Sequence, residues 1–378
     1  MTPKNRRTFI SDSLKTATGI LVAGSALSEN AEARTYQPDR KLGVALCGLG
    51  EFATGSIAPE IAYTKNVKLA GVITGDPEGK GREWAGKYGF PEKNIYHYDQ
   101  IEQMSGNPDI DFIHVVTPNG IHAANTIAIA RAGKHVLCEK PMATNSEDCR
   151  KMIEECKKAG VLLGIDYRLN WEPHHLKMME MAGSKTYGDL KTLVTDFSWL
   201  RGDHKPWLLD MELAGGGALF DTGVYPIQAG CYLTGEKPIR VTAVANSTRS
   251  VYSPDIEETI SALFEFPNGT VMSARASYAY NSDCCIVNAE NGTFSGEGWF
   301  WAQSVDGKPV SRYIKLPEDK VFKVEGTLQQ AVLLDAFAEA IMNKTPFRTP
   351  GEMGLRDIQI MEATYASAKT GKLVEIKY

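Results

Sequence analysis

Lys140 is the residue of this sequence that most clearly suggests chemistry, because it stands directly behind an apolar stretch, within the tripeptide Glu139-Lys140-Pro141. The stretch His135 to Cys138 has the composition of a buried parallel β-strand. Ligands of open α/β sheets bind outside the carboxyl ends of such strands, so an ammonium group there faces a ligand crevice. Lysine before proline at a helix start is otherwise an ordinary solvated residue, and Ser146 reads as the N-cap of the next helix. The interpretation of Lys140 as a catalytic cation therefore depends on motifs elsewhere in the chain.

Asp221 and Tyr225 follow the glycine run Gly215 to Gly217 and form the second group of candidate catalytic residues. They are four residues apart and share one face if the segment is helical, which would make them an acid–base pair. A tyrosine is a poor base at neutral pH, but a nearby ammonium such as that of Lys140 favours the phenolate form. Tyr225 could then remove the proton of a substrate hydroxyl. The structural alternative is a glycine loop followed by Asp221 as an N-cap and a packed Tyr225.

The elements that would position these residues begin with Gly48-Leu49-Gly50-Glu51-Phe52-Ala53, between the apolar run Leu42 to Cys47 and a helical stretch from Ser56 to Tyr63. This G-x-G-x-x-A turn is typical of dinucleotide binding: the first glycine permits the tight turn, the second lets backbone amides approach the pyrophosphate, and the alanine keeps the helix close to the strand. Alone, the motif also fits an ordinary glycine turn. Recurring strand-like runs separated by helical segments favour a Rossmann NAD(P)-binding domain over residues 42–165, and they are Val67 to Ile73, Phe112 to Val116, His135 to Cys138 and Val161 to Ile165.

Thr74 stands where NAD-specific sites carry the carboxylate that bonds the ribose 2′-hydroxyl. The pair Thr74-Gly75 presents no negative charge to repel a 2′-phosphate, and Lys80 and Arg82 are close enough in the chain to bind one. Asp76 opposes this interpretation, because it could turn back toward the ribose. We therefore expect NADP as the cofactor, with NAD as the alternative.

The remainder of the chain, residues 166–378, predicts an α+β domain that binds substrate and mediates oligomerisation. Runs rich in Val, Thr, Ser and aromatic residues predict an open, largely antiparallel sheet with strands at Lys191 to Trp199, Arg240 to Thr248, Ile256 to Phe266 and Thr270 to Tyr278. Pro267-Asn268-Gly269 predicts a hairpin between the last two strands. Helices at Leu328 to Met342 and Glu352 to Lys369 close the chain, and we expect the second to pack back on the first domain. A homodimer or homotetramer through the sheet is the expected assembly.

The first 33 residues predict an export signal. Asn5 to Ile10 form a twin-arginine pattern, thirteen uncharged residues follow from Thr16 to Ser28, and Ala31-Glu32-Ala33 is an A-x-A cleavage site. We expect a Tat signal cleaved after Ala33 and a periplasmic protein without a membrane anchor. The alternative is a basic amphipathic first helix. An apolar run of thirteen residues is too short for a membrane-spanning helix.

The composition limits the kinds of partner. The 378 residues suffice for two domains, and without residues 1–33 the chain holds 37 basic against 43 acidic residues, a formal net charge of −6. That balance argues against nucleic acid and anionic membranes as partners. The seven cysteines are an odd number with no C-x-x-C spacing, so we expect free, mostly buried thiols and no disulfide framework. No spacing of histidine, cysteine and carboxylate residues suggests a metal site.

Several segments of the chain resemble, in the same order, those of the Gfo/Idh/MocA superfamily and, within it, the glucose-fructose oxidoreductase group. They are Gly48 to Ala53, Thr117 to His122, Glu139 to Ala143, Asp166 to Arg168, Glu212 to Tyr225, Tyr232 to Pro238 and Thr349 to Asp357. The resemblance implies Lys140 and Tyr225 as catalytic residues with Asp221 as their polar support; inositol dehydrogenase relatives usually have histidine where Tyr225 stands. It implies a cofactor site formed by Gly48, Leu49, Gly50, Phe52, Ala53, Thr74, Gly75, Lys80, Thr117, Pro118, Asn119, His122, Glu139, Lys140 and Arg168. Read without the resemblance, His122 is a packed histidine at a helix start.

The substrate pocket is expected next to these residues. We expect it to be lined by Lys140, Arg168, Trp207, Asp221 and Tyr225, with His174 and His175 as further candidates. Packing in the core or at the surface is the alternative for Arg168, Trp207 and the two histidines. The stretch from Asp196 to Leu209 does not clearly reproduce that of glucose-fructose oxidoreductase, so the sequence leaves the identity of the sugar open.

The favoured function is an exported, NADP-dependent sugar oxidoreductase with tightly bound cofactor, which transfers hydride between a hydroxyl carbon of a sugar and the nicotinamide. It could couple oxidation of an aldose to reduction of a ketose, or act as a simple aldose dehydrogenase. An NAD-dependent glycoside hydrolase of the same superfamily is one alternative, although such relatives carry a histidine in the glycine-rich loop and Gly215 to Gly217 have none. A non-catalytic sugar- or nucleotide-binding protein is the other, and it would need neither Lys140 nor Tyr225.

Overall fold

The computed structural model describes residues 40–201, 206–252, 255–301, 304 and 308–378. The predicted export signal and its cleavage site after Ala33 lie outside these residues. None of the helices in the described part of the chain is long and apolar enough to cross a lipid bilayer.

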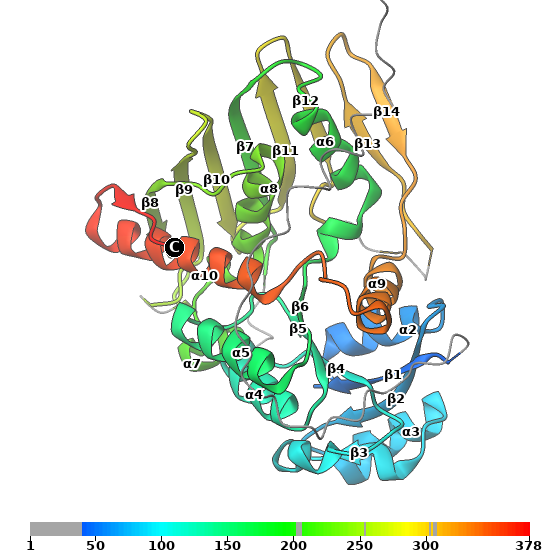
Figure 1. Cartoon of the computed structure of the whole chain (residues 1–378). Helices are drawn as coiled ribbons and strands as arrows, with labels where there is room; N and C mark the ends of the chain where they lie inside the picture. The colour runs from blue at the N-terminus through cyan, green and yellow to red at the C-terminus, as the bar shows by residue number, and fades with distance from the viewer. Residues whose placement is uncertain (1–39, 202–205, 253–254, 302–303, 305–307) are drawn as a thin grey trace, which may run out of the picture. The chain divides into compact units, whose positions relative to one another are not determined.

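Within these residues, the first sheet has six parallel strands in the order β3-β2-β1-β4-β5-β6, which is the strand order of a Rossmann fold (Figure 1). The strands are β1 (Leu42–Cys47), β2 (Val67–Ile73), β3 (Ile95–Tyr96), β4 (Phe112–Val115), β5 (His135–Glu139) and β6 (Leu163–Asp166). Every residue of β1 is buried, which explains its continuous apolar sequence. The five predicted strands are confirmed, although β6 begins two residues later than predicted. The edge strand β3 was not predicted, because two residues carry no periodicity.

Four helices of the described chain accompany this sheet. They are α2 (Ala58–Ile61), α3 (Arg82–Tyr88), α4 (His122–Arg131) and α5 (Ser146–Ala159). The helical stretch predicted after the glycine turn begins earlier, as a π-helical turn over Ala53–Ile57 that continues into α2. The predicted N-cap of α5 was wrong by one residue: Asn145 is extended, and its side chain accepts the hydrogen bond from the Asp148 amide.

The second sheet has nine strands in the described residues, in the order β14-β13-β12-β11-β7-β10-β9-β8-β15. Their bounds are β7 (Leu190–Ser198), β8 (Arg240–Asn246), β9 (Thr259–Glu265), β10 (Val271–Ser277), β11 (Ser282–Ala289), β12 (Gly292–Glu297), β13 (Arg312–Lys315), β14 (Val321–Val324) and β15 (Val374–Glu375). The predicted hairpin of β9 and β10 is confirmed, with Gly269 at φ +83° in its turn. The sheet is mixed, since β7 and β10 pair in parallel while the other neighbours are antiparallel.

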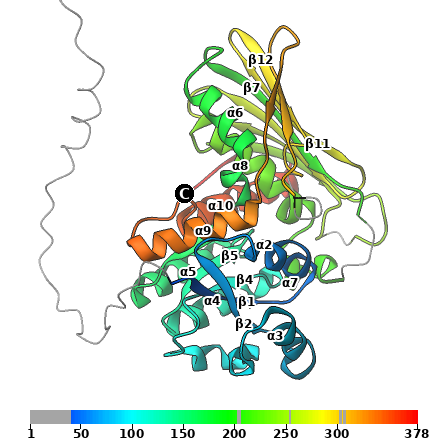
Figure 2. The same ribbon diagram turned by 90° about the vertical axis from the view of Figure 1, so that its right-hand side faces the viewer.

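The helices that follow the first sheet are α6 (Pro173–Gly183), α7 (Met211–Ala214), α8 (Val224–Thr234), α9 (Gln329–Asn343) and α10 (Gly351–Thr370). Figure 2 shows α6, α8 and α10 on one face of the nine-stranded sheet, and no helix of the described chain covers the other face. Helix α10 also contacts α5 and β6, so its predicted return to the first domain is confirmed.

Helix α9 is fastened to the first sheet by two buried or half-buried carboxylates. Glu60 of α2 accepts hydrogen bonds from the backbone amides of Gln330 (2.9 Å) and Ala331 (3.1 Å), and so caps the N-terminus of α9. Asp335 in the same helix accepts the amide of Asn66 at 2.8 Å. The first turn of α9 therefore has a fixed place beside the ends of the parallel strands.

All seven cysteines lie in the described residues, and each thiol is free. Six are buried and Cys284 is partly exposed, which confirms the sequence prediction. Burial raises the pKa of every one of them above its ordinary value, so they are packing residues and not nucleophiles.

Candidate active site

A cavity of about 220 Å³ opens at the carboxyl ends of the parallel strands, with β7 and α8 forming its other walls. It is lined by Phe52, Val116, Thr117, Asn119, Glu139, Lys140, Pro141, Arg168, Phe197, Trp199, Arg201, Trp207, Leu208, Asp221, Thr222, Tyr225 and Trp301. Nine residues predicted from the sequence for the cofactor or the substrate therefore meet here. They are Phe52, Thr117, Asn119, Glu139, Lys140, Arg168, Trp207, Asp221 and Tyr225.

Lys140 reaches the centre of this cavity from the end of β5, after which the Lys140–Pro141 peptide is cis. Its Nζ donates to the backbone carbonyl of Asp221 at 2.8 Å, and it lies 3.7 Å from the carboxylate of the same residue. Burial alone lowers the pKa of this ammonium. Interactions with Tyr225, Asp221 and Glu139 outweigh burial, so the pKa is raised and the charge is retained.

Tyr225 stands in the first turn of α8, 6% exposed, with two cations beside its ring. The ring centroid is 4.8 Å from Lys140 Nζ and 5.0 Å from the guanidinium carbon of Arg168. Arg168 also donates from Nε to the Tyr225 hydroxyl at 3.3 Å. Two positive charges therefore stand beside the side chain that would exchange a proton with the substrate.

Arg168 is held in this position by three hydrogen bonds in different directions. Besides the bond to Tyr225, its two terminal nitrogens donate to Gln329 Oε1 and to the Phe300 carbonyl, each at 2.8 Å. Arg168 is 5% exposed, and the planar guanidinium satisfies these acceptors at fixed angles. The structure thus places Arg168 against the candidate base, whereas the sequence analysis predicted it only at the cofactor or the substrate.

Asp221 is anchored by residues that the sequence analysis did not identify. Arg201 forms an ion pair with its carboxylate at 2.6 Å, and the Tyr278 hydroxyl donates to the same oxygen at 3.2 Å. The segment Leu219–Gly223 is a π-helical turn that runs into α8, and it has no side-chain cap. The alternative in which Asp221 is an N-cap is therefore wrong, and Asp221 and Tyr225 lie in one helical segment that lines the cavity.

Glu257 holds the glycine run from the side opposite the cavity. Its carboxylate accepts the backbone amides of Gly217 at 2.9 Å and Leu219 at 2.7 Å, and the hydroxyl of Tyr365 at 3.0 Å. A Cβ on Gly217 would lie 1.9 Å from the Glu257 carbonyl oxygen, so only glycine permits this contact. Glu257 and Glu258 stand side by side at the start of an apolar strand. This pair was the available signal in the sequence for a role of Glu257, because a carboxylate is buried only where it has partners.

The turn after β1 has the shape that a dinucleotide requires. Gly48 has φ +98°, and a Cβ there would meet the Val116 carbonyl at 2.7 Å, whereas a Cβ on Gly50 would point into open space. Lys80 extends over the turn and donates from Nζ to the Leu49 carbonyl. The turn therefore leaves room beside Gly50 for a pyrophosphate, with an ammonium group near it.

Asp76 does not face the ribose position. Its carboxylate accepts the backbone amides of Gly79 (2.9 Å) and Lys80 (3.0 Å), so it caps the following turn. Hydrogen bonds from these amides lower the pKa of Asp76. Thr74 is buried, and a Cβ added to Gly75 would meet only the Tyr98 ring at 3.8 Å. The carboxylate that opposed a 2′-phosphate in the sequence analysis is thus engaged elsewhere.

Sequence comparison identifies the family. The profile of the Gfo/Idh/MocA oxidoreductase family, NAD-binding Rossmann fold, matches residues 42–167, and that of the GFO/IDH/MocA C-terminal domain matches residues 175–295. The chain belongs to the Gfo/Idh/MocA family. It is therefore an NAD(P)-dependent oxidoreductase, as the sequence predicted.

Relatives within the Gfo/Idh/MocA family cover most of the chain. The crystal structure of an aldose-aldose oxidoreductase from Caulobacter crescentus has a TM-score of 0.84 and 35% identity, over 89% of this chain and all of that chain. A 1,5-anhydro-D-fructose reductase from Ensifer adhaerens is 25% identical over 73% of this chain and 83% of its own length. A D-xylose 1-dehydrogenase [NADP(+)] from Haloarcula marismortui is 23% identical over 89% and 94%.

Other predicted residues do not line the cavity of this Gfo/Idh/MocA protein, and they include His122, His174, His175 and Pro118. His122 is fully buried behind the wall, with its ring nitrogens 2.7 Å from the Thr117 carbonyl and 3.0 Å from the Pro141 carbonyl, so it fastens two loops and does not line the cleft. Burial lowers its pKa. His174 and His175 are buried in α6 and pack on the indole of Trp299, so the expectation that they line the sugar pocket was wrong.

Proposed function

We propose that this protein interconverts a CH–OH group of a sugar and the corresponding carbonyl, with NADP as the hydride carrier. Oxidation removes a hydride from the carbon and a proton from its hydroxyl, and the cofactor supplies the hydride acceptor. Tyr225 takes the proton in the oxidation direction and returns it in the reduction direction. The observation that carries the proposal is Tyr225, which lines the cavity at the end of the Rossmann sheet and has two cations beside its ring, one of which donates to its hydroxyl.

The lining of the cavity supports a sugar as substrate. Phe197, Trp199, Trp207 and Trp301 line it together with several charged side chains. A sugar ring offers apolar C–H faces to the former and hydroxyl groups to the latter. The volume of about 220 Å³ lies below the roughly 300–1,000 Å³ of sites for larger ligands, so one sugar ring is the appropriate size. The relatives named above act on aldoses, anhydrofructose and xylose according to their names.

NADP is proposed over NAD because of the second strand and the turn that follows it. Thr74 offers no carboxylate to the ribose, Asp76 is used in capping, and the ammonium of Lys80 lies over the glycine turn. The ammonium of Lys80 favours the 2′-phosphate of NADP, and Thr74 and Asp76 do not oppose it. Arg82 contributes less than the sequence analysis allowed, because it pairs with Glu78 at 2.7 Å and with Glu92 at 3.3 Å.

Compartment and reaction cycle are proposed together. The twin-arginine pattern and the A-x-A site ending at Ala33 support export of a folded, loaded protein to the periplasm. No free nucleotide pool is expected there, so the cofactor would remain bound and be regenerated in place. Oxidation of an aldose to its lactone would reduce the cofactor, and a second carbonyl substrate, such as a ketose, would take the hydride and a proton from Tyr225.

The uncovered face of the nine-stranded sheet supports self-association, as a homodimer or homotetramer. Large apolar side chains on it are exposed at Val244 of β8, Leu263 of β9, Val271 of β10 and Tyr313 of β13. An apolar patch on a sheet without a helical cover is typical of a protein interface. Light scattering after gel filtration should give a mass of at least two chains, and Leu263→Glu should lower it.

The decisive experiment follows the bound nucleotide. Mass spectrometry of the nucleotide released from purified protein should find NADP. Mixing the loaded protein with an aldose alone should produce one equivalent of bound NADPH and then stop. Addition of a ketose should reoxidise the nucleotide, return the NADPH absorbance to its starting value and allow a further cycle. Bound NAD would refute the cofactor assignment. Continuous turnover with external NADP and no second sugar would show an ordinary dissociable-cofactor dehydrogenase.

The role of Tyr225 has its own test. Tyr225→Phe should retain the nucleotide and lose about a hundredfold or more in hydride transfer, which is the usual effect of removing a positioned acid–base group. Tyr232→Phe is the matched control, because Tyr232 lies in the same helix outside the cavity and donates only to the sulfur of Met353 at 3.5 Å. Near-normal transfer in Tyr225→Phe would remove this residue from the mechanism.

A further inference from the structure

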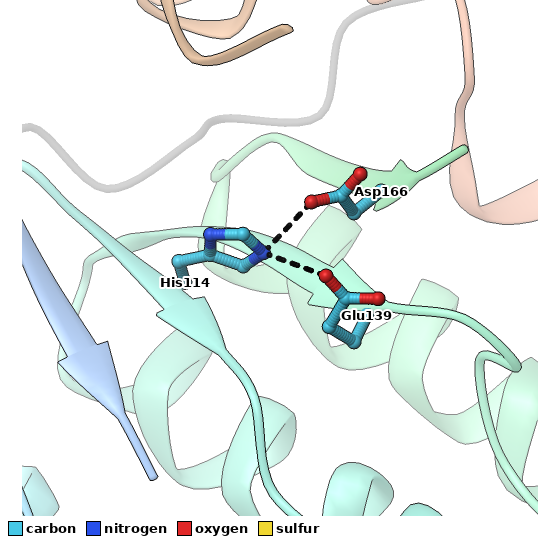
Figure 3. A group of neighbouring side chains, drawn as sticks. All are labelled: His114, Glu139 and Asp166. Carbon is cyan, nitrogen blue, oxygen red and sulfur yellow. Dashed lines mark ion pairs between the residues drawn. The ribbon is translucent and has the colours of Figure 1, made fainter. Parts of the chain in front are cut away.

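One histidine and two carboxylates form a buried cluster next to the active-site cavity (Figure 3). His114 belongs to β4, and Glu139 and Asp166 are the last residues of β5 and β6. The Nε2 atom of His114 lies 3.1 Å from Asp166 Oδ2 and 3.6 Å from Glu139 Oε1. Figure 3 shows both carboxylates pointing to this one nitrogen. The cluster therefore joins the carboxyl ends of three neighbouring strands.

Two carboxylates of the cluster share one imidazole, so a positive charge on His114 offsets only one of their negative charges. His114 is 0% exposed, Asp166 1% and Glu139 8%, so water screens the two carboxylates poorly. Burial lowers the pKa of His114, but its bonds to Asp166 and Glu139 outweigh burial and raise the pKa to about 9. Burial and the charge of Asp166 raise the pKa of Glu139 as well. Both carboxylates thus favour the protonated imidazole over the neutral one.

Each carboxylate of the cluster is connected to one of the two cations beside Tyr225. On one side, the backbone amide of Lys140 donates to Glu139 Oε2 at 3.2 Å. Lys140 is also the residue that follows Glu139 in the chain, so the direction in which it leaves β5 depends on this carboxylate.

On the other side, Arg168 stands two residues after Asp166. The side chain of Gln330 donates to Asp166 Oδ1 at 3.4 Å, and the neighbouring Gln329 accepts from Arg168 at 2.8 Å. Both glutamines belong to the first turn of α9. Asp166 is therefore linked to Arg168 along the chain and through α9.

We propose that His114 is a positioning residue of the active site, which joins Glu139 to Asp166 and thereby sets the places of Lys140 and Arg168 around Tyr225. The inference rests on the proposed function, because it assumes that Tyr225 exchanges the substrate proton. Misplacement of reacting groups by about 1 Å can cost on the order of a hundredfold in rate, so a distant link of this kind has a measurable effect.

Three variants separate the link from simple packing. His114→Phe removes every donor and leaves two carboxylates facing each other. The double variant His114→Phe with Asp166→Asn relieves that repulsion but does not restore the link. His114→Gln keeps two amide donors that can reach both oxygens. We expect kcat within about threefold of the unmutated protein for His114→Gln. For the double variant we expect normal thermal stability, nucleotide affinity within about twofold, and a kcat lower by about 10- to 100-fold with little change in KM.

His97→Phe serves as the matched control. His97 also pairs with a carboxylate, Asp99 at 2.7 Å, but its side chain is 43% exposed and it stands just after β3, at the edge of the first sheet and outside the cavity. The His97→Phe variant should have the same turnover as the unmutated protein. If the folded double variant turns over within threefold of the unmutated protein, the link is not needed and the inference is wrong.

Two further measurements do not depend on turnover. With ¹⁵N-labelled histidine, the His114 ring should show a proton on Nε2, the nitrogen that faces both carboxylates, assigned by the loss of its signals in His114→Gln. A ring without a proton on Nε2 would overturn the inference even if hydride transfer is normal, whereas a protonated Nε2 without hydride transfer in the unmutated protein would refute the proposed function alone. One equivalent of a divalent metal in the purified protein, absent from His114→Gln, would instead make the three side chains ligands and also overturn the inference.

Discussion

Arg168→Met is the substitution that most directly tests how the site stabilises Tyr225. Arg168 donates from Nε to the Tyr225 hydroxyl at 3.3 Å and is 5% exposed, so little water screens the interaction. Methionine keeps an unbranched apolar stem, which is shorter than that of arginine, and removes the charge and every donor. The Tyr225 ring keeps Lys140, 4.8 Å from its centroid, as the remaining cation.

The expected loss follows from the hydrogen bond to a charged group. Such a bond contributes about 1.5–3 kcal/mol, and every 1.4 kcal/mol corresponds to about tenfold in rate, so hydride transfer should slow by about 10- to 100-fold. The substitution also leaves Gln329 Oε1 and the Phe300 carbonyl without this donor. Each acceptor that loses its donor lowers the folding stability by about 1–3 kcal/mol if no other donor replaces the bond. Thermal unfolding must therefore be measured in parallel.

A double-mutant cycle gives the decisive assay. Single-turnover reduction of the bound nucleotide is followed by absorbance in the unmutated protein, Arg168→Met, Tyr225→Phe and the combination. If Arg168 acts through the Tyr225 hydroxyl, it should cost less than about threefold in the Tyr225→Phe background, because the acceptor is already gone. Equal losses in both backgrounds would refute the reasoning.

The matched control for Arg168 is Arg348→Met. The Arg348 guanidinium also lies over an aromatic ring, 4.6 Å from the centroid of Trp171, and donates to a backbone carbonyl, that of Asn170, at 2.8 Å. It does not line the cavity. Loss of stability without loss of single-turnover rate is the expected result, and a comparable loss of rate would show that the effect of Arg168→Met is not specific to the site.

Further predictions concern four other residues. Lys140→Met should slow hydride transfer by about a hundredfold and move its pH profile to higher pH, because the ammonium that stabilises the phenolate is gone; an unshifted profile would leave Lys140 only a positioning role. Thr74→Asp should change the ratio of the dissociation constants for NADP and NAD at least about tenfold in favour of NAD, measured by titrating apoprotein with either nucleotide. Glu257→Gln should lower the free energy of unfolding in urea by about 1–3 kcal/mol, because an amide oxygen replaces a carboxylate that binds three donors. The pKa of His114 is higher in the folded chain than its ordinary value. The protonated histidine therefore stabilises the folded chain fully below about pH 6.5, and this stabilisation is lost as the pH rises through about 9. The difference in unfolding free energy between the unmutated protein and His114→Gln should shrink across that range.

The features predictable from the sequence are those with local causes. The continuous apolar run of β1 and the glycines at 48 and 50 specify a strand and a turn within a few residues, and both are present as expected. Lys140 could be placed at the cavity because the end of a parallel strand has a defined position in this fold. Tyr225 followed from its spacing to Asp221 once the segment was taken as helical.

The partners of these residues were not predictable, because they come from distant parts of the chain. Arg201 meets Asp221 across 20 residues, Glu257 meets Gly217 across 40, and Arg168 meets Gln329 across 161. The parallel pairing of β7 with β10 is non-local in the same way. The partners of Asp76 are local: its side chain caps the turn immediately after it, whereas the sequence analysis considered it only for the ribose.

The charges that line the cavity explain why so many buried partners are needed. Lys140, Arg168 and Arg201 bring three positive charges, and Glu139 and Asp221 bring two negative ones. The balance of one positive charge is suited to a reaction in which negative charge passes between the Tyr225 oxygen and a substrate oxygen, because fixed charges stabilise that charge without having to reorganise. Like charges confined in a small space repel one another, however, so each must be held by its own contacts. The carboxylate of Asp221 holds Arg201, Gln329 and the Phe300 carbonyl hold Arg168, and the carbonyl and carboxylate of Asp221 hold the ammonium of Lys140. The rate of proton exchange at Tyr225 should therefore depend on residues that touch neither substrate nor cofactor.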